Sequence, residues 1–472
     1  VGAEAGVSQT TIGDNVGIGA KALHTNVTGL YNTAVGHRAS NYITGNHNTT
    51  LGWKAGNQVE GGTHSTFIGS QAGLGYAGTQ DAADRIDGVY NTCLGYRAGY
   101  GLKTTANKNT FVGNQAGGGS STAVTAADCV AMGYLALEDL TSGINNIAIG
   151  NYAGKGLTIG ESNVAIGHQA LEASVDGDCN IAIGQRALQD FEDADGNGAN
   201  ICIGTDAMKE ATTANGNVVL GHGAVDTGIM TGNHNVVIGA EAAEDLTTAY
   251  ENVIIGYSAG QALIGGTDQA IYNVIIGSEA GKGLTTDNYI TAIGHQALRD
   301  AQGSTGVTAI GYKAMRESAA GADNCTVIGY EAGQHSNAIN NTCLGMGAGK
   351  FLEDGAGNVF VGKYAGLGLT GDKIDGNDNT CIGTASGTAM IGTAHSNTYL
   401  GGQAGDKTTT GFENICVGFD ADISAVGGDN QIVIGNNVSG SGDDRIVIGN
   451  DSGTYYLDYT SGSQSWTQTS DV

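Results

Sequence analysis

Three groups of residues have types and spacings that would suit chemistry, and the first is a candidate calcium site. The run Asp-Ala-Asp-Gly-Asn-Gly places oxygen ligands at Asp193, Asp195 and Asn197 around a glycine turn. Calcium loops arrange oxygen ligands at alternate positions in this way. The run lacks the bidentate Glu of an EF-hand loop at the proper distance. The same residue types are also typical of a solvated turn, which is the simpler interpretation.

The second group is the eight cysteines, which have neither the spacing of a disulfide framework nor that of a metal site. The chain has no Cys-x-x-Cys, and five of the cysteines stand at the centre of a short apolar segment: Cys93, Cys202, Cys343, Cys381 and Cys416. Structural metal sites need paired spacings. We therefore predict that these cysteines serve as small apolar side chains.

The third group is a set of rings that each follow a regularly repeated glycine: His37, Tyr96, Tyr134, His168, His222, Tyr257, His295, Tyr312 and Tyr330. Such rings could stack against sugars, although a turn position that accepts any amphipathic side chain is the simpler interpretation. No nucleophile elbow, zinc motif or convergent set of acids and histidines occurs. We therefore expect no catalytic residues and no organic cofactor.

A repeat of about 17 residues must position all of these groups. It reads Asn, a β-branched residue, a variable residue, an aliphatic residue, Gly, two variable residues, Ala, and then often Gly or Leu, as in Asn163–Leu171. The central glycines run from Gly2 to Gly449 and give 26 copies, and 19 of the 25 spacings are 16–18 residues. Two β-branched or aliphatic residues that flank a third are typical of a short strand.

A unit of this length buries a face only when it stacks on its neighbours. The repeat therefore predicts an all-β fold, a parallel β-solenoid of about 26 coils over residues 1–453, with residues 454–472 as a C-terminal cap or tail and almost no helix. Asn stands four residues before the glycine in 18 of 25 complete copies, which predicts an Asn ladder between coils.

The remaining positions of the repeat predict how each coil packs. Gly after the strand indicates a positive φ or a close backbone approach. Ala three residues later indicates a tight inward-facing spot. We assign the strictly kept aliphatic pair to the coil interior. The variable residue between them is then expected to face outward and to be buried by lateral association with other copies of the chain.

Composition excludes several classes of protein. The chain has 472 residues, with 82 Gly, no Pro and a net charge of −27. Collagen needs Pro and a three-residue period. A disordered linker would not carry 40% hydrophobic residues, and a nucleic-acid-binding face needs clustered Lys and Arg. No apolar run reaches about 18 residues, so we expect no membrane insertion.

The Asn-x-x-Ile-Gly-x-x-Ala unit resembles the head repeat of trimeric autotransporter adhesins, the YadA-like family, and the related β-roll repeats of bacteriophage tail fibres. The resemblance covers roughly residues 1–453 and implies a left-handed roll, a homotrimer and a rigid adhesive or spacer rod. The period of about 17 residues is longer than that of the shortest coils in the head family. The ending Thr469-Ser-Asp-Val472 is similar to the junction at which phage fibres meet a self-cleaving chaperone.

We therefore expect a structural or adhesive fibre, a phage tail fibre or other virion appendage that spans a distance and contacts a glycan or protein receptor on the host surface. Its location would be the virion, the cell surface or the extracellular space. Since the chain starts at Val1 inside a repeat, we expect a fragment or processed product.

Two alternatives remain open. One is the head of a bacterial trimeric surface adhesin. The other belongs to a different class, a ligand-binding β-solenoid such as an ice-binding or calcium-binding module. Flat rows of Thr on an outer face would favour ice binding. Here Thr shares a position with Val and Ile that we assign to the core, which argues against it.

Overall fold

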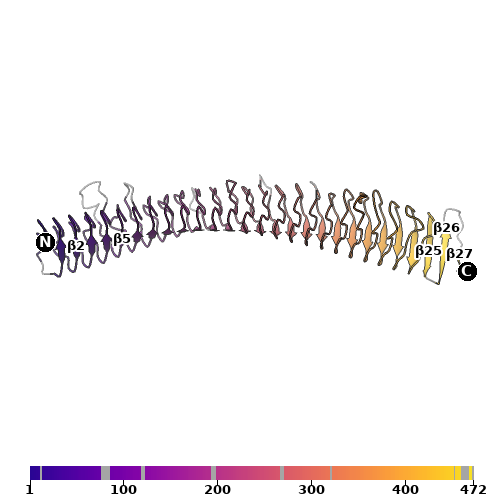
Figure 1. Ribbon diagram of the computed structural model, residues 1–472, viewed down its shortest axis with the longest axis horizontal. Helices are drawn as coiled ribbons and strands as arrows, with labels where there is room; N and C mark the ends of the chain where they lie inside the picture. Colours follow the sequence, from indigo (N-terminus) through magenta and orange to yellow (C-terminus); the bar gives the residue numbers. More distant parts are fainter. Residues whose placement is uncertain are drawn as a thin grey trace. The chain divides into compact units, whose positions relative to one another are not determined.

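The computed structural model describes residues 1–10, 13–75, 86–118, 123–192, 198–265, 270–318, 321–450, 452–458 and 467–469. Over these residues the chain is an all-β parallel β-solenoid of about 24 turns with a repeat of about 17 residues, and it has no helix (Figure 1). The described residues accordingly include no helix long and apolar enough to cross a membrane. The predicted fold class is confirmed at this level.

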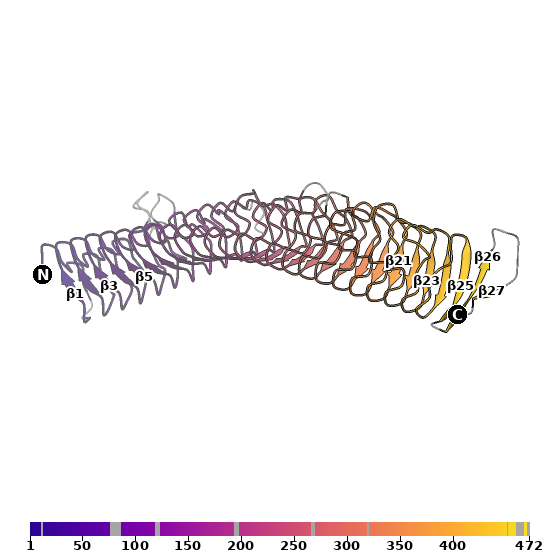
Figure 2. The same ribbon diagram turned by 45° about the vertical axis from the view of Figure 1, so that its right-hand side comes forward.

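The chain forms two compact units, and the first comprises residues 1–235. Each coil of this unit contributes a three-residue strand that pairs in parallel with the strands of adjacent coils (Figure 2). The register matches equivalent residues, so that Ala182 pairs with Ala165 on one side and with Cys202 on the other. The strands are β1 Val16–Ile18, β2 Thr33–Val35, β3 Thr49–Leu51, β4 Thr66–Ile68, β5 Thr92–Leu94, β6 Thr110–Val112, β7 Val130–Met132, β8 Ile147–Ile149, β9 Val164–Ile166, β10 Ile181–Ile183, β11 Ile201–Ile203 and β12 Val218–Leu220.

The second unit comprises residues 236–472 and begins with the same parallel stacking. Its strands are β13 Val236–Ile238, β14 Val253–Ile255, β15 Val274–Ile276, β16 Thr291–Ile293, β17 Thr308–Ile310, β18 Thr326–Ile328, β19 Thr342–Leu344, β20 Val359–Val361, β21 Thr380–Ile382, β22 Thr398–Leu400, β23 Ile415–Val417, β24 Ile432–Gly435, β25 Arg445–Asn450, β26 Gly453–Asp458 and β27 Thr467–Thr469.

The solenoid has about 24 turns where the motif count predicts 26, and the difference lies at the two ends. Among the described residues no strand precedes β1, so the copy around Gly2 contributes none. At the other end, β25 pairs in parallel with β24 and antiparallel with β26, and β26 pairs antiparallel with β27. The chain therefore leaves the parallel stack through an antiparallel meander.

The glycine that follows each strand allows adjacent coils to approach closely. Gly167 has a φ of 138°, and a Cβ atom built on it would lie 2.3 Å from the carbonyl oxygen of Gly184 in the next coil. Gly150 stands in the same relation to Gly167, at 2.4 Å. No side chain fits at such a distance, which is why the repeat requires glycine here.

The predicted Asn ladder is present, and it joins consecutive coils. The Oδ1 atom of Asn146 accepts hydrogen bonds from the backbone N–H of Asn163 at 2.9 Å and from its Nδ2 at 3.1 Å. Asn163 Nδ2 also donates to the carbonyl of Gly177 at 2.7 Å, and its Oδ1 accepts from the backbone of Asn180 at 2.9 Å. The buried amide therefore satisfies backbone groups of two coils at once.

The assignment of the two strand faces is wrong, and the structure reverses it. Ala165, at the centre of β9, is fully buried inside the coil, whereas the flanking Val164 and Ile166 are only half-buried and face outward. Every strand from β2 to β24 has its buried residue at the second position. The interior is completed by the Ala that follows three residues after the central glycine, such as Ala170, and this inward-facing Ala is confirmed.

The inner row accepts side chains of very different size because a second position in the same coil compensates. Where the strand centre is Phe111 or Tyr399, the residue four after the central glycine is a glycine, and a Cβ there would lie 2.3 Å or 2.5 Å from the ring. Where the strand centre is Ala165, the same place holds the buried Leu171. In these coils a large side chain at one place is matched by a small one at the other, which keeps the interior filled.

Candidate functional site

The outer face of the strands is the most extensive candidate site. It consists of the first and third residues of strands β1 to β24, and we call it the outer face below. Its first row is Val, Ile or Thr, and its third row is Ile, Leu, Val or Met. Leu51 and Leu400 are each 47% exposed, and Ile149 is 37% exposed. At about 4.8 Å per strand, this apolar strip runs for about 50 Å along each unit.

The outer face also lacks charge. From β1 to β24 no strand contains Asp, Glu, Lys or Arg, although the chain carries a net charge of −27. Monomeric proteins rarely leave a contiguous apolar strip of this extent in contact with water. The face therefore has the character of a contact surface.

The threonines of the repeat lie on this outer face, which corrects the argument made against ice binding. Thr49 and Thr92 are exposed, and Thr33, Thr66 and Thr110 are partly exposed, in five consecutive strands from β2 to β6. The predicted core position of this row is wrong because a two-residue alternation does not itself indicate which face is inside.

The structure places the five cysteines of the strand centres inside the coils. Cys93, Cys202, Cys343, Cys381 and Cys416 are fully buried and free. Burial raises the pKa of these five thiols, which keeps them neutral. The prediction that they act as small apolar side chains is confirmed. Asp193, Asp195 and Asn197 lie outside the described residues.

Rings outside the strands form stacks that follow the solenoid. In the predicted row after the central glycine, His295, Tyr312 and Tyr330 are stacked in consecutive coils at centroid separations of 5.4 Å and 5.0 Å. A second stack, missed by the sequence analysis, joins Tyr31, His47, His64 and Tyr90 at 4.8–5.3 Å. The available signal was an aromatic residue five before the glycine in four consecutive copies.

An acidic cluster that the sequence analysis also missed joins two coils near β22 and β23. One carboxylate oxygen from each of Asp406, Asp420 and Asp422 lies within 4.8 Å of the others. Lys407 Nζ lies 2.8 Å from Oδ2 of the buried Asp422. Burial, together with a hydrogen bond to Asp422, raises the pKa of Asp406 to about 6. Because Lys407 already balances Asp422, we interpret the cluster as a structural ion-pair network.

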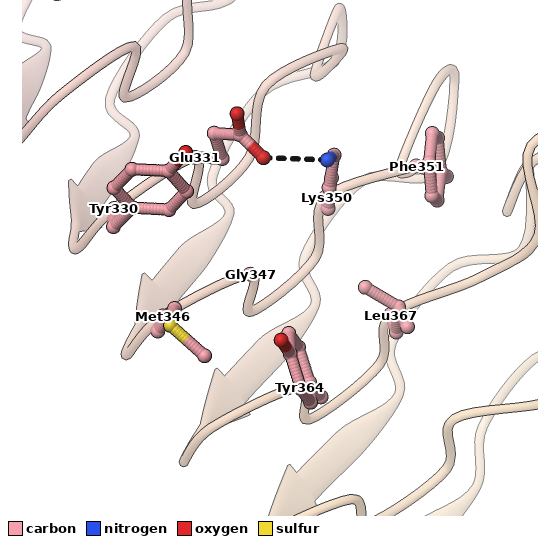
Figure 3. A pocket seen from close by; sticks show the side chains of 8 residues that line it. All are labelled: Tyr330, Glu331, Met346, Gly347, Lys350, Phe351, Tyr364 and Leu367. Atoms are coloured by element: carbon pink, nitrogen blue, oxygen red, sulfur yellow. Dashed lines mark hydrogen bonds and ion pairs between the residues drawn. The ribbon is translucent and has the colours of Figure 1, made fainter.

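A hollow of about 240 Å³ opens beside the ends of β18, β19 and β20 (Figure 3). It lies where Gly347 leaves a gap between side chains of neighbouring coils. Tyr364 and Met346 form its lower part in the view of Figure 3, and an ion pair between Glu331 and Lys350 forms the upper part. The hollow therefore combines apolar walls with a polar rim, which is the usual composition of a small-molecule site.

No protein-family model, no curated protein and no solved structure matches this chain. The resemblance to autotransporter heads and phage fibres stays a prediction that depends on the repeat motif. The candidate sites are accordingly judged by their geometry and chemistry.

Proposed function

We propose that this chain forms the shaft of a homotrimeric structural or adhesive fibre, a phage tail fibre or other virion appendage that spans a distance and contacts the host surface. The observation that carries the proposal is the uncharged outer face of the strands in each unit, whose third row holds only Ile, Leu, Val and Met. The number of copies, three, and the left-handed roll come from the resemblance.

Three further properties support a fibre. The outer face repeats with the coil, so identical copies in register would present the same contact at every level. The charged side chains lie outside strands β1 to β24, so association through the outer face does not bring like charges together on that face. The parallel strand pairing and the Asn ladder join consecutive coils, which makes each unit a stiff spacer.

The mass of the chain in solution tests the proposal. One chain has a mass of 47.4 kDa, and light scattering on the full chain should give three times this value. Replacing Ile166, Ile183 and Ile203 together by Asp introduces three charges on the outer face of β9–β11. We expect this triple variant to lose the trimer, because an interface core tolerates unpaired charge poorly.

The matched control introduces the same three charges into the same three coils away from the outer face. Ser162, Cys179 and Ala199 are exposed turn residues with φ values of 60°, 58° and 47°, a conformation that Asp accepts. Their replacement by Asp should leave a trimer. A monomeric wild-type chain would contradict the proposal, as would a control that dissociates while the outer-face variant stays assembled.

Ice binding is the second candidate function, favoured by the outward threonines of β2–β6. Ice binding requires the outer face to be exposed to solvent, whereas the fibre requires that face to be buried between copies of the chain. Thermal hysteresis measured on the same sample decides between them. A monomer whose hysteresis is lost on Thr66→Lys would establish ice binding in place of the fibre.

The sequence beyond this chain separates a virion appendage from a bacterial adhesin head. A self-cleaving chaperone domain encoded downstream would support the phage fibre. A coiled coil followed by an outer-membrane anchor would support the adhesin, which has the same trimeric shaft in a different location.

A further inference from the structure

We propose that the hollow around Gly347 binds one neutral pyranose ring of a glycan. This inference rests on the proposed function, since a fibre that contacts a host needs a surface that recognises it. The site belongs to the second unit and follows the ends of β18–β20, so that it lies beside the outer face and not on it.

The hollow exists because a row of side chains is interrupted. The residue two after each central glycine has a left-handed backbone, as in Lys313 (φ 53°), Glu331 (φ 50°) and Tyr364 (φ 61°), and it carries a side chain away from the coil. Gly347 (φ 64°) occupies this place in the coil between Glu331 and Tyr364. The missing side chain leaves a gap about two coil spacings high, about 10 Å between the flanking backbones.

The ring of Tyr364 extends over this gap. A Cβ atom built on Gly347 would lie 2.7 Å from Cδ1 and 2.9 Å from Cε1 of Tyr364. The absence of a side chain at residue 347 is therefore what gives the ring its position. In Figure 3, Tyr364 and Met346 border one part of the hollow, and Leu367 borders another. Together these side chains offer an apolar wall of the kind that the C–H groups of a sugar ring contact.

The opposite rim is polar and remains able to accept and donate further hydrogen bonds. Lys350 Nζ lies 2.6 Å from Oε2 of Glu331. The hydrogen bond from Lys350 lowers the pKa of Glu331, which keeps its carboxylate ionised. The carboxylate and the ammonium group each have bonding capacity beyond their mutual contact. Adjacent sugar hydroxyls, which donate and accept, match such a pair.

Other rings of the molecule differ from Tyr364 in what covers them. Tyr330 stacks on Tyr312 at 5.0 Å, and Tyr31 stacks on His47 at 4.8 Å, so each of these rings has a face against its neighbour. Tyr364 instead borders the gap at Gly347, and its contact is with Lys363, whose Nζ lies 5.0 Å from the ring centroid. A row of regularly stacked rings leaves no such space for a ligand, whereas the interrupted row does.

Size and charge indicate the class of ligand. The volume of about 240 Å³ is below the roughly 300–1,000 Å³ of sites for drug-sized molecules, so the hollow suits one ring. The Glu331–Lys350 pair is neutral in sum, the nearby Lys363 is engaged with the ring of Tyr364, and the net charge of −27 disfavours anionic sugars. We therefore assign a neutral hexose, with a dissociation constant on the order of millimolar for a contact of this size.

Saturation-transfer NMR and titration on the full chain test the assignment. The probes are the methyl glycosides of glucose, galactose, mannose and N-acetylglucosamine, with methyl glucuronide as the anionic comparison. We expect at least one neutral glycoside to bind and the glucuronide to bind more weakly. Tyr364→Ala removes the ring. Gly347→Gln fills the gap and displaces the ring of Tyr364, on a backbone that Gln296 and Gln403 show to accept Gln (φ 57° and 60°). Each variant should weaken binding at least tenfold.

The matched control is Tyr152→Ala, which removes a tyrosine from the same left-handed position (φ 62°) in the first unit. It should bind the sugar as the wild type does. Absence of binding by all four neutral glycosides would overturn the assignment, and so would binding that Tyr364→Ala and Gly347→Gln leave unchanged. The mass of each sample separates the two proposals: a trimer without sugar binding contradicts this inference alone, whereas a monomeric wild type contradicts the proposed fibre.

Discussion

The inner row and the outer face of the same strands carry very different sets of side chains. The inner row ranges from Gly17 through Ala165 and Phe111 to Tyr399. On the outer face, the row that begins each strand of the parallel stack up to β24 holds only Val, Ile and Thr. The buried positions vary, and the half-exposed positions are uniform.

The inner row tolerates this range because a nearby interior position adjusts in size, within the coil or, as where Leu137 lies close to Gly154, between adjacent coils. A large strand centre such as Phe111 is compensated by Gly117 in the same coil, and a small one such as Ala131 by Leu137. No such partner exists within a coil for the outer face. Its uniformity is therefore what a repeated contact with another surface would require.

The largest expected effect tests the compensation inside a coil. Phe111→Ala should destabilise the chain by about 3–5 kcal/mol, because it leaves a cavity in a fully buried row. Adding Gly117→Leu should recover most of that loss, since the double variant reproduces the Ala131 and Leu137 pair of the next coil, where Leu137 has a φ of 51°. Guanidinium unfolding followed by circular dichroism measures both.

The control for this prediction is Thr110→Val, on the outer face of the same strand. It should change stability by no more than about 0.5 kcal/mol, because Val already occupies this row in other coils. A double variant no more stable than Phe111→Ala would contradict compensation. It would mean that each position of the inner row packs independently of the other interior place.

An intermediate effect is expected for the Asn ladder, which bounds the inner row. Asn163→Ala should cost about 1–3 kcal/mol, because backbone groups of the adjacent coils, including the N–H of Asn180, lose their buried partner. Asn163→Ser should cost less, since Ser65 occupies the same place and its Oγ accepts from the backbone N–H of Asn91 at 3.2 Å. Thermal unfolding of the two variants checks the order, and equal losses would contradict a hydrogen-bonding role.

The smallest expected effect concerns a coil whose interior place holds a charged residue. Asp422 stands four residues after Gly418, where most other coils have Gly or Leu. Burial, together with the hydrogen bond to Asp422, raises the pKa of Asp406 to about 6 from an ordinary value of 3.8. The folded chain therefore binds this proton more tightly than the unfolded chain does. Stability should fall as the pH rises from about 4 to about 6, by about 1 kcal/mol after allowance for partial exposure.

Asp406→Asn removes the titrating group and should flatten this part of the stability profile. Denaturant unfolding between pH 4 and pH 7 measures the slope for both proteins. Identical slopes in the wild type and Asp406→Asn would contradict the assignment of this pH dependence to the acidic cluster.

Most of the fold could be predicted from local sequence features. The spacing of the central glycines indicated the coil, the β-branched residues indicated the strand, and Asn163 and its equivalents indicated the ladder. Each of these follows from a local steric or hydrogen-bonding need. The hollow could not be predicted in the same way, because Glu331, Gly347 and Tyr364 come from three coils and meet only through the stacking register.

The parallel stacking of short strands about 17 residues apart follows from the amino-acid sequence, since no single unit can bury its apolar side chains alone. Which strand face is enclosed depends on how the coil closes in three dimensions. Alternation with a period of two divides the residues between two faces but is the same whichever face is inside. Closure of the coil by Ala170 and Leu171 encloses Ala165, and it leaves Val164 and Ile166 facing outward.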